Sequence, residues 1–238
     1  MADVDLLAEH PDIAAVAATQ PGGHSAQRSR LLYAVARVVG ERTYAGTTVA
    51  DVVRQAGVSR TTFYAEFAGK EEVFLEAYRH GVDVIDARID RAVRTTTDWR
   101  AQLRAGIDAY LRALADGPVF ARAYLLQLPL AGPAALAARD VALRRFAERY
   151  RQTFVLARRE RPELAEPPAD ALHVLCAGTE HLAADRVRAG QVDRLPELAD
   201  VFCHCAESVL MGPARPAVPL ERPAPDPDPD LAADPDLA

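Results

Sequence analysis

The sequence is poor in the residues that mark several common protein classes. Only three of its 238 residues are cysteines, without a framework spacing, which predicts a protein of the reducing cytoplasm. Aromatic residues make up 6%, and no runs rich in β-branched residues occur, so strands are not expected. No stretch of 18 or more apolar residues is present, and the N-terminus lacks the basic start of a secretion signal. The sequence therefore predicts an all-α protein that does not span a membrane.

Sequence patterns of common enzymes are also missing. The chain contains no Gly-rich phosphate loop, no His-Glu-x-x-His and no nucleophile-elbow spacing. The adjacent carboxylates Glu71 and Glu72 stand where a helix is expected to begin, and the helix dipole favours acidic side chains there. We therefore expect neither an enzyme nor a bound cofactor.

The net charge of −6 would by itself argue against nucleic-acid binding, but the acidic residues are unevenly spread. Residues 1–24 carry four acids and no Lys or Arg, and residues 212–238 carry six acids against two Arg. Residues 25–80, with eight Lys or Arg against six acids, are the one basic segment. Phosphate neutralisation supplies most non-specific affinity for DNA. A segment of only +2 should therefore bind random DNA weakly and depend on base contacts and dimerisation.

Residues 47–74 are the most informative segment, because they read as two short helices joined by a tight turn and followed by the start of a longer helix. Thr48 is a natural N-cap of the first helix, Gly57 ends it, and Ser59 caps the second. The second helix places Phe63 and Phe67 on its inner side and Arg60, Thr61, Thr62, Tyr64 and Glu66 on its outer side. Such a helix, braced by another across an Ala-Gly-Val turn, is typical of a DNA-reading helix-turn-helix.

Several motifs here share one register: Thr47-Thr48-Val49, Ala56-Gly57-Val58-Ser59, Thr62-Phe63-Tyr64, Phe67 and Lys70-Glu71. In that spacing, residues 28–80 resemble the TetR family of bacterial transcriptional regulators. Lys70 is the only lysine in the chain, and it stands where the family's lysine closes the reading helix onto the next helix, near a DNA phosphate. One departure is Thr43, where the family usually has Gly. We expect Gly46 to supply the missing backbone freedom.

The resemblance implies that the helix of about residues 59–66 enters the major groove of an operator in double-stranded DNA. Arg60 is the predicted base reader, because its guanidinium matches the O6 and N7 atoms of guanine. Glu66 is expected to be repelled by phosphates unless it accepts from a cytosine or faces away. The other predicted DNA contacts are Thr61 and Thr62 at base edges or thymine methyls, Ser59 at the helix start, and Tyr64, Thr48, Lys70, Arg28 and Arg30 at phosphates.

The remainder of the chain is predicted to follow the family's layout, with three helices in the DNA-binding domain and six behind it. We expect a flexible arm at residues 1–24, the helix-turn-helix domain at 25–70, a ligand-binding and dimerisation domain at 71–211, and a disordered Pro/Asp tail at 212–238. The helices expected besides the helix-turn-helix pair span about 26–41, 70–95, 99–115, 118–128, 133–159, 169–189 and 195–210.

Most aromatic residues outside the DNA-binding domain fall on the middle helices, where the resemblance implies a cavity for a small-molecule effector. Aromatic residues at helical spacing also suit an ordinary core, so each assignment competes with plain packing. The ligand is expected to be apolar or aromatic, because a few neutral hydrogen-bonding groups and no cluster of charges stand among the predicted lining residues. These are Tyr78, Val82, Ile85, Trp99, Ile107, Tyr110, Tyr124, Gln127, Phe146 and Tyr150.

The last two predicted helices carry apolar stripes at i, i+3 and i+7 spacing. The resemblance implies that these helices pair with their copies from a second chain into a four-helix bundle, and a homodimer would let two reading helices contact two half-sites. The alternative is that the stripes pack only on their own body. The predicted interface residues are Leu172, Leu175, Thr179, Leu198, Phe202, Cys205 and Val209.

The predicted function is a dimeric DNA-binding transcriptional regulator, a repressor released from its operator by an apolar or aromatic molecule. Two alternatives stay open. His173, Cys176, Cys203 and Cys205 stand on adjacent predicted helices and could sense a metal or a redox change, although residues 203–205 point in different directions around a helix. An interaction protein with a vestigial DNA-binding domain would fit the weak basic charge.

Overall fold

The computed structural model describes residues 26–212, and this part of the chain is entirely helical, without strands. The predicted N-terminal arm and all but the first residue of the predicted tail lie outside the described residues. No helix between residues 26 and 212 combines the length and the apolar character that crossing a membrane would require.

The N-terminal end is a three-helix unit built from α2 (Ala26–Glu41), α3 (Val49–Ala56) and α4 (Arg60–Glu66). Thr48 caps α3, and Gly57 ends it in the left-handed conformation, with a φ of 63°, that residues with a Cβ rarely adopt. Ser59 then caps α4, which keeps the turn between the two helices short. The predicted bounds of all three helices are confirmed to within a residue.

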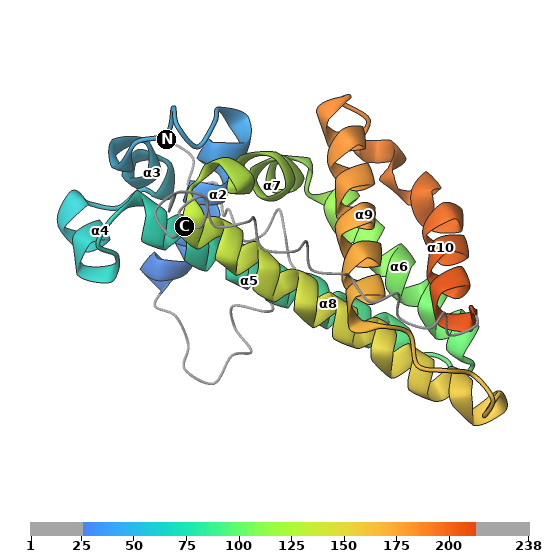
Figure 1. Ribbon diagram of the computed structural model, residues 1–238. Coiled ribbons are helices and arrows are strands. Elements are labelled where there is room, and N and C mark those ends of the chain that lie inside the picture. The colour runs from blue at the N-terminus through green and yellow to red at the C-terminus, as the bar shows by residue number, and fades with distance from the viewer. Residues whose placement is uncertain (1–25, 213–238) are drawn as a thin grey trace, which may run out of the picture.

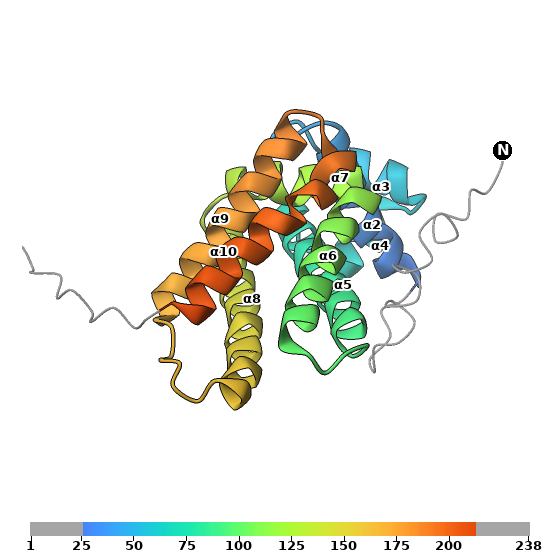
Figure 2. The same cartoon turned by 90° about the vertical axis from the view of Figure 1, so that its right-hand side faces the viewer.

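Two long helices, α5 (Lys70–Val93) and α8 (Pro133–Glu160), run away from the three-helix unit (Figure 1). The helices α6 (Trp99–Asp116), α9 (Ala169–Arg188) and α10 (Ala199–Met211) gather at the far end, and α9 and α10 lie side by side across the face that Figure 2 turns to the viewer. The three-helix unit of α2, α3 and α4 is called the reading unit below. Because α5 begins beside this unit and continues into the helical body, it belongs to both.

The segment expected as one helix over 118–128 is divided in three. The helix α7 (Pro118–Arg122) passes into a π-helical turn, η1 (Ala123–Gln127), and then into a 3-10 turn, η2 (Leu128–Leu130). A second 3-10 turn, η3 (Val192–Leu198), contains Pro196 and replaces the first residues of the helix predicted over 195–210. The sequence prediction missed both departures.

The interior has two apolar clusters. One joins α2, α3 and α4 to the first half of α5 and to η1, and its largest side chains include Phe63, Phe67 and Phe74. The other joins α6, the end of α8, α9, η3 and α10 around Trp99, Phe154 and Phe202. The first cluster packs the three-helix unit against the first half of α5.

Candidate DNA-reading surface and internal cavity

The outer side of α4 is a polar surface held in place by buried aromatic residues. Phe63 is fully buried, while Arg60, Thr61 and Tyr64 are exposed, Tyr64 to 58%. The Ser59 hydroxyl accepts from the Thr62 backbone N–H at 3.0 Å, so Ser59 caps the start of the helix. The arrangement leaves one exposed arginine at the start of α4.

A reciprocal cap fixes the start of α3. The Thr48 hydroxyl accepts from the Asp51 backbone N–H, and the Asp51 carboxylate accepts from the Thr48 N–H at 3.1 Å. Arg42 and Arg54 also donate to Asp51. The bonds from Thr48 and the two arginines hold the pKa of Asp51 at about 2, below its ordinary 3.8. The Thr48 side chain, predicted to contact phosphate, is therefore already engaged within the cap.

We expect Asp51→Asn to lower the melting temperature near neutral pH and to flatten its dependence on acid. The ionised Asp51 carboxylate stabilises the fold above its ordinary pKa of 3.8, and this contribution is lost as the pH falls through about 2. Thermal unfolding from neutral pH down to pH 2 should show the wild-type and variant curves converging. Parallel curves over that range would contradict the role given to the cap.

Arg28, predicted to contact phosphate, has partners within the protein. Its guanidinium pairs with Glu66 at 3.0 Å and with Glu76, and it stacks 4.3 Å from the centroid of the Phe67 ring. These contacts fasten the end of α4 to α2 and α5. Glu66 was predicted to be repelled by phosphates unless it accepts from a cytosine or faces away. Its carboxylate is instead paired with Arg28 within the protein. Arg30 is half-buried on the same helix, and its phosphate contact stays a prediction.

Two of the three N–H donors of the Lys70 ammonium bond to carbonyls within the protein. Its ammonium donates to the carbonyls of Tyr44 at 2.8 Å and Thr47 at 2.9 Å and lies 4.3 Å from the centroid of the Tyr44 ring. The predicted role of Gly46 was wrong, because its φ is not positive; instead its N–H donates to the Thr43 hydroxyl at 3.0 Å. At most one Lys70 donor remains for a phosphate.

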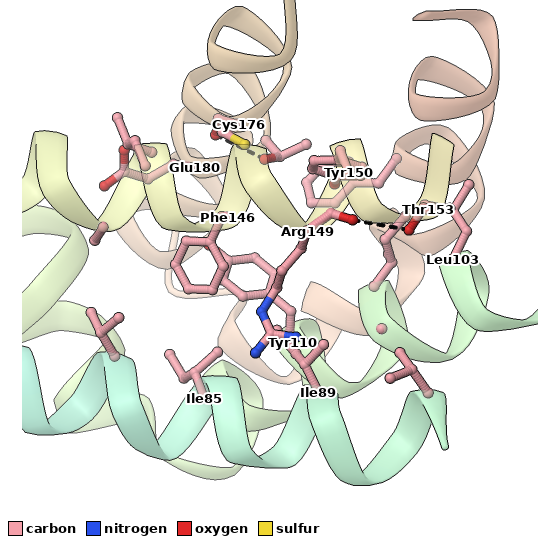
Figure 3. A pocket seen from close by; sticks show the side chains of 18 of the residues that line it. Ile85, Ile89, Leu103, Tyr110, Phe146, Arg149, Tyr150, Thr153, Cys176 and Glu180 are labelled. Carbon is pink, nitrogen blue, oxygen red and sulfur yellow. Dashed lines mark hydrogen bonds between the residues drawn. The ribbon is translucent and has the colours of Figure 1, made fainter. Parts of the chain in front are cut away.

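A partly open cavity of about 250 Å³ lies between α5, α6, α8 and α9 (Figure 3). This volume lies slightly below the range of roughly 300–1,000 Å³ usual for small-molecule sites. Ile85 and Ile89 enter from α5, Tyr110 from α6 and Phe146 from α8. Of the residues predicted to line a cavity, those on its wall are Tyr78, Val82, Ile85, Ile107, Tyr110, Tyr124, Phe146 and Tyr150.

Two predicted lining residues lie elsewhere. Trp99 is 1% exposed and fills the second apolar cluster, where its indole N–H donates to Glu160 at 3.2 Å. Gln127 points toward the reading unit, and its side-chain oxygen accepts from the Tyr44 backbone N–H at 3.0 Å. Both corrections follow from helix geometry. Trp99 stands at the first turn of α6, and Gln127 ends the π turn, which alters the register that an α-helix would have given.

Charged residues on the cavity wall were missed by the sequence prediction. Arg149 on α8 borders the cavity and bonds to Asp86 at 2.6 Å and Asp90 at 2.8 Å on α5, while Glu180 on α9 pairs with Arg139 at 2.6 Å. Asp86 and Asp90 stand four residues apart on α5, and Arg145 and Arg149 stand four residues apart on α8. This matched spacing could have predicted the ion pairs from the sequence. Each charge already has a partner, so the cavity offers no free ion for a ligand.

The remaining polar groups on the wall are neutral. Burial raises the pKa of the Tyr78, Tyr110 and Tyr150 hydroxyls, so all three stay protonated at physiological pH. Burial also raises the pKa of the Cys176 thiol, to about 12. The cavity can therefore enclose an apolar body and hydrogen-bond to neutral oxygen or nitrogen atoms.

The predicted dimer stripe is mostly internal. Leu172, Leu175, Leu198 and Phe202 are each under 9% exposed, and Thr179 borders the cavity. Val209 is half-buried, and Cys205 alone of the predicted set is exposed. The three leucines and Phe202 therefore pack in the core of their own protomer, as the alternative expectation had it, because the strongest apolar stripe of each helix faces inward. The exposed apolar residues of α9 and α10 are Val174, Leu182 and Val201.

Residues 26–212 contain no group of three or more His, Cys, Asp or Glu side chains placed to hold a metal ion. Cys176 is buried, Cys203 half-buried and Cys205 exposed. A raised thiol pKa at Cys176 and Cys203 opposes the thiolate form that metal binding and oxidation require. The metal or redox alternative gains no support from this arrangement.

Comparisons with known proteins agree with this geometry. Residues 31–77 match the family model described as bacterial regulatory proteins, tetR family. The HTH-type transcriptional activator FasR of Mycolicibacterium smegmatis is 34% identical over 84 residues, which are 35% of this chain and 38% of FasR. The chain thus matches well under half the length of that relative.

Solved structures share the fold over most of the chain. The fatty acid degradation regulator FadR from Bacillus halodurans superposes with a TM-score of 0.69 at 17% identity, covering 81% of this chain and 98% of that one. FadR from Bacillus subtilis in complex with stearoyl-CoA has a TM-score of 0.66 at 16% identity, covering 78% and 98%. At these identities the likeness establishes the fold alone.

Proposed function

We propose that this chain, which carries the N-terminal domain of the tetR family of bacterial regulators, is a ligand-responsive DNA-binding transcriptional regulator, acting as a repressor or an activator. The exposed outer side of α4, with Arg60 at its start, carries the proposal. A capped helix-turn-helix with a buried inner side and a polar outer side has the form required to enter a major groove. Its readers are Arg60, Thr61 and Thr62, with Tyr64 and the remaining Lys70 donor at phosphates.

Arg60→Ala is expected to weaken operator binding by about 1–3 kcal/mol and to relax base preference at one position of each half-site. Fluorescence anisotropy with DNA from beside the protein's own gene, and with that DNA changed at single positions, measures both effects. Arg79→Ala removes the same charge from an exposed position on α5 and should change affinity little. Equal effects of the two variants would show that Arg60 contributes charge and not base reading.

The ligand proposed for the cavity is a long apolar molecule with a neutral hydrogen-bonding group. The wall is mostly aliphatic and aromatic, its charged side chains Arg149 and Glu180 are paired with residues behind the wall, and its tyrosine hydroxyls are neutral. A free carboxylate would meet Glu180 and an arginine already bonded to two aspartates, so it is disfavoured. An acyl chain suits these walls, and the structurally similar FadR of Bacillus subtilis was solved with stearoyl-CoA.

We also propose a homodimer, formed through the surface of α9 and α10 that carries the exposed apolar residues Val174, Leu182 and Val201, called the patch below. These side chains are 68%, 43% and 41% exposed, on helices that lie side by side at the surface (Figure 2). Gly178 is exposed between Val174 and Leu182 on α9 and would let a second helix approach closely. The proposed interface uses different residues of α9 and α10 from those predicted from the sequence.

Val174→Glu is expected to convert the dimer to a monomer, because each charge would be buried in the interface without a partner. Sedimentation equilibrium gives the mass, and circular dichroism should show an intact helical protomer. Val141→Glu changes an exposed valine on α8, outside the patch, and should leave the dimer unchanged. A stable Val174→Glu dimer would place the interface on another face.

A further inference from the structure

The π-helical turn η1 lies between the cavity and the reading unit. Its widened geometry is defined by the Leu128 N–H, which donates to the Ala123 carbonyl five residues earlier. Such turns are rare, and they occur often at functional sites because they shift the register of a helix. The two ends of this turn make different contacts. Tyr124, near its start, borders the cavity, and Gln127, at its end, bonds to the loop before α3.

On the cavity side, Tyr124 is wedged against α5. Its hydroxyl donates to the Ala77 carbonyl at 2.8 Å, and its ring centroid lies 5.5 Å from that of Tyr78. Gly81 makes the approach possible, because a Cβ there would come within 2.5 Å of the Tyr124 ring. A molecule in the cavity therefore contacts a side chain that is closely packed against α5.

On the other side, Gln127 holds the loop between α2 and α3. Its side-chain oxygen is the acceptor for the Tyr44 N–H, while the Tyr44 and Thr47 carbonyls accept from Lys70. Thr47 directly precedes Thr48, the N-cap of α3. Gln127 and Lys70 thus both bond to the backbone of this loop, and α3 in turn packs on the reading helix.

The segment before the turn is fixed. At Gly40 on α2, a Cβ would lie 2.1 Å from the Val119 carbonyl oxygen of α7, so the two backbones are in direct contact. With α7 anchored, a displacement of Tyr124 has to be taken up at the C-terminal end of η1. That end is where Gln127 stands.

We propose that η1 transmits occupancy of the cavity to the DNA-reading unit, with Tyr124 as the positioning residue on the cavity side and Gln127 on the DNA side. Displacing the Tyr124 ring changes the register of the π turn and draws Gln127 away from Tyr44. The loop of residues 43–47 then loses its bond to Gln127 while it keeps its contacts with Lys70 and Phe74, and α3 and α4 change their orientation relative to α5. This inference rests on the proposed function and names the route by which the ligand acts.

The first test needs neither ligand nor DNA. Hydrogen exchange of the full-length protein is measured in Gly81→Ala, which presses a methyl group against Tyr124, and in Tyr124→Leu, which removes the ring. In each folded variant, exchange at residues 43–48 should rise about five- to tenfold, the factor that corresponds to losing one hydrogen bond. The matched controls are Gly106→Ala and Tyr110→Leu, which change the cavity wall on α6 and should leave that segment unchanged.

The outcomes are distinct. Unchanged exchange at 43–48 in a folded Gly81→Ala or Tyr124→Leu protein would overturn the route, and so would an equal rise in the α6 controls. The leucine variant keeps the test decisive if the alanine variant does not fold, because it removes volume instead of adding it.

The second test uses stearoyl-CoA as the probe and DNA from beside the protein's own gene. Gln127→Leu should bind stearoyl-CoA within about twofold of wild type, yet the probe should alter its DNA affinity no more than about twofold, against a wild-type effect of roughly 5–150-fold. Gln191→Leu, which loses a similar bond accepted from the Arg186 guanidinium after the end of α9 and away from the cavity wall, should keep the wild-type effect. A full response in Gln127→Leu would overturn the route. If stearoyl-CoA does not bind the wild type, the proposed ligand fails, while the exchange test still decides the route.

Discussion

Phe202→Glu is expected to unfold or nearly unfold the protomer, lowering the free energy of unfolding by about 3–5 kcal/mol. Phe202 is 2% exposed, lies in the second apolar cluster and borders the cavity, so a carboxylate there would be buried without a partner. The sequence had placed this residue at a dimer interface, where the same substitution would release stable monomers. The structure makes it a core residue instead.

Urea denaturation followed by circular dichroism distinguishes the two assignments. It must be run at one fixed protein concentration, because the stability of a dimer depends on concentration. His204→Glu adds the same charge two residues along α10 at an exposed position and should cost little. A folded Phe202→Glu monomer with wild-type stability would return Phe202 to the interface.

Arg149→Met is expected to lower the free energy of unfolding by about 2–4 kcal/mol. Asp86 is 3% exposed at its side chain, and Arg149 is one of two arginines that neutralise it; Arg145 is the other. The loss is smaller than for a fully buried pair because Arg145 remains. Arg144→Met, on the exposed side of the same helix, should change stability little.

The loss in free energy of unfolding caused by Arg149→Met should depend on pH. Burial already raises the pKa of Asp86 against the opposing effect of the arginines, and losing Arg149 raises it further. A carboxyl whose pKa is higher in the folded state stabilises the fold in acid and loses that contribution as the pH rises through the folded value. Denaturation from acid to neutral pH should therefore show a growing difference from wild type. Arg149→Met/Asp86→Leu should recover part of the loss, and a double variant weaker than either single one would contradict this explanation.

The helix bounds and the reading unit could be predicted from the sequence because their signals are local. Thr48, Gly57 and Ser59 punctuate two short helices, and each capping interaction spans three or four residues. The periodicity of the long helices was equally visible. It did not tell which apolar stripe faces inward, so the strongest stripe on α10 was assigned to a partner although it fills the protomer's own core.

The roles of several polar residues could not be predicted, because they depend on contacts between distant segments. Arg28 binds Glu66 and Glu76, which lie 38 and 48 positions away, and no local pattern distinguishes this from a phosphate contact. Gln127 is a neutral hydrogen-bonding residue of the kind expected on a cavity wall. At the end of the π turn, however, its side chain accepts from the N–H of Tyr44, 83 positions earlier. A single non-α turn was enough to move it from the cavity to the reading unit.

The most direct test of the account is a binding titration of the full-length protein with DNA from beside its own gene, against a shuffled fragment of equal length and composition. At physiological salt, a helix-turn-helix that reads bases should prefer the first DNA by a factor of about 10³ or more. Equal affinity for both fragments, or none for either, would contradict a DNA-reading regulator and favour an interaction protein with a vestigial DNA-binding domain.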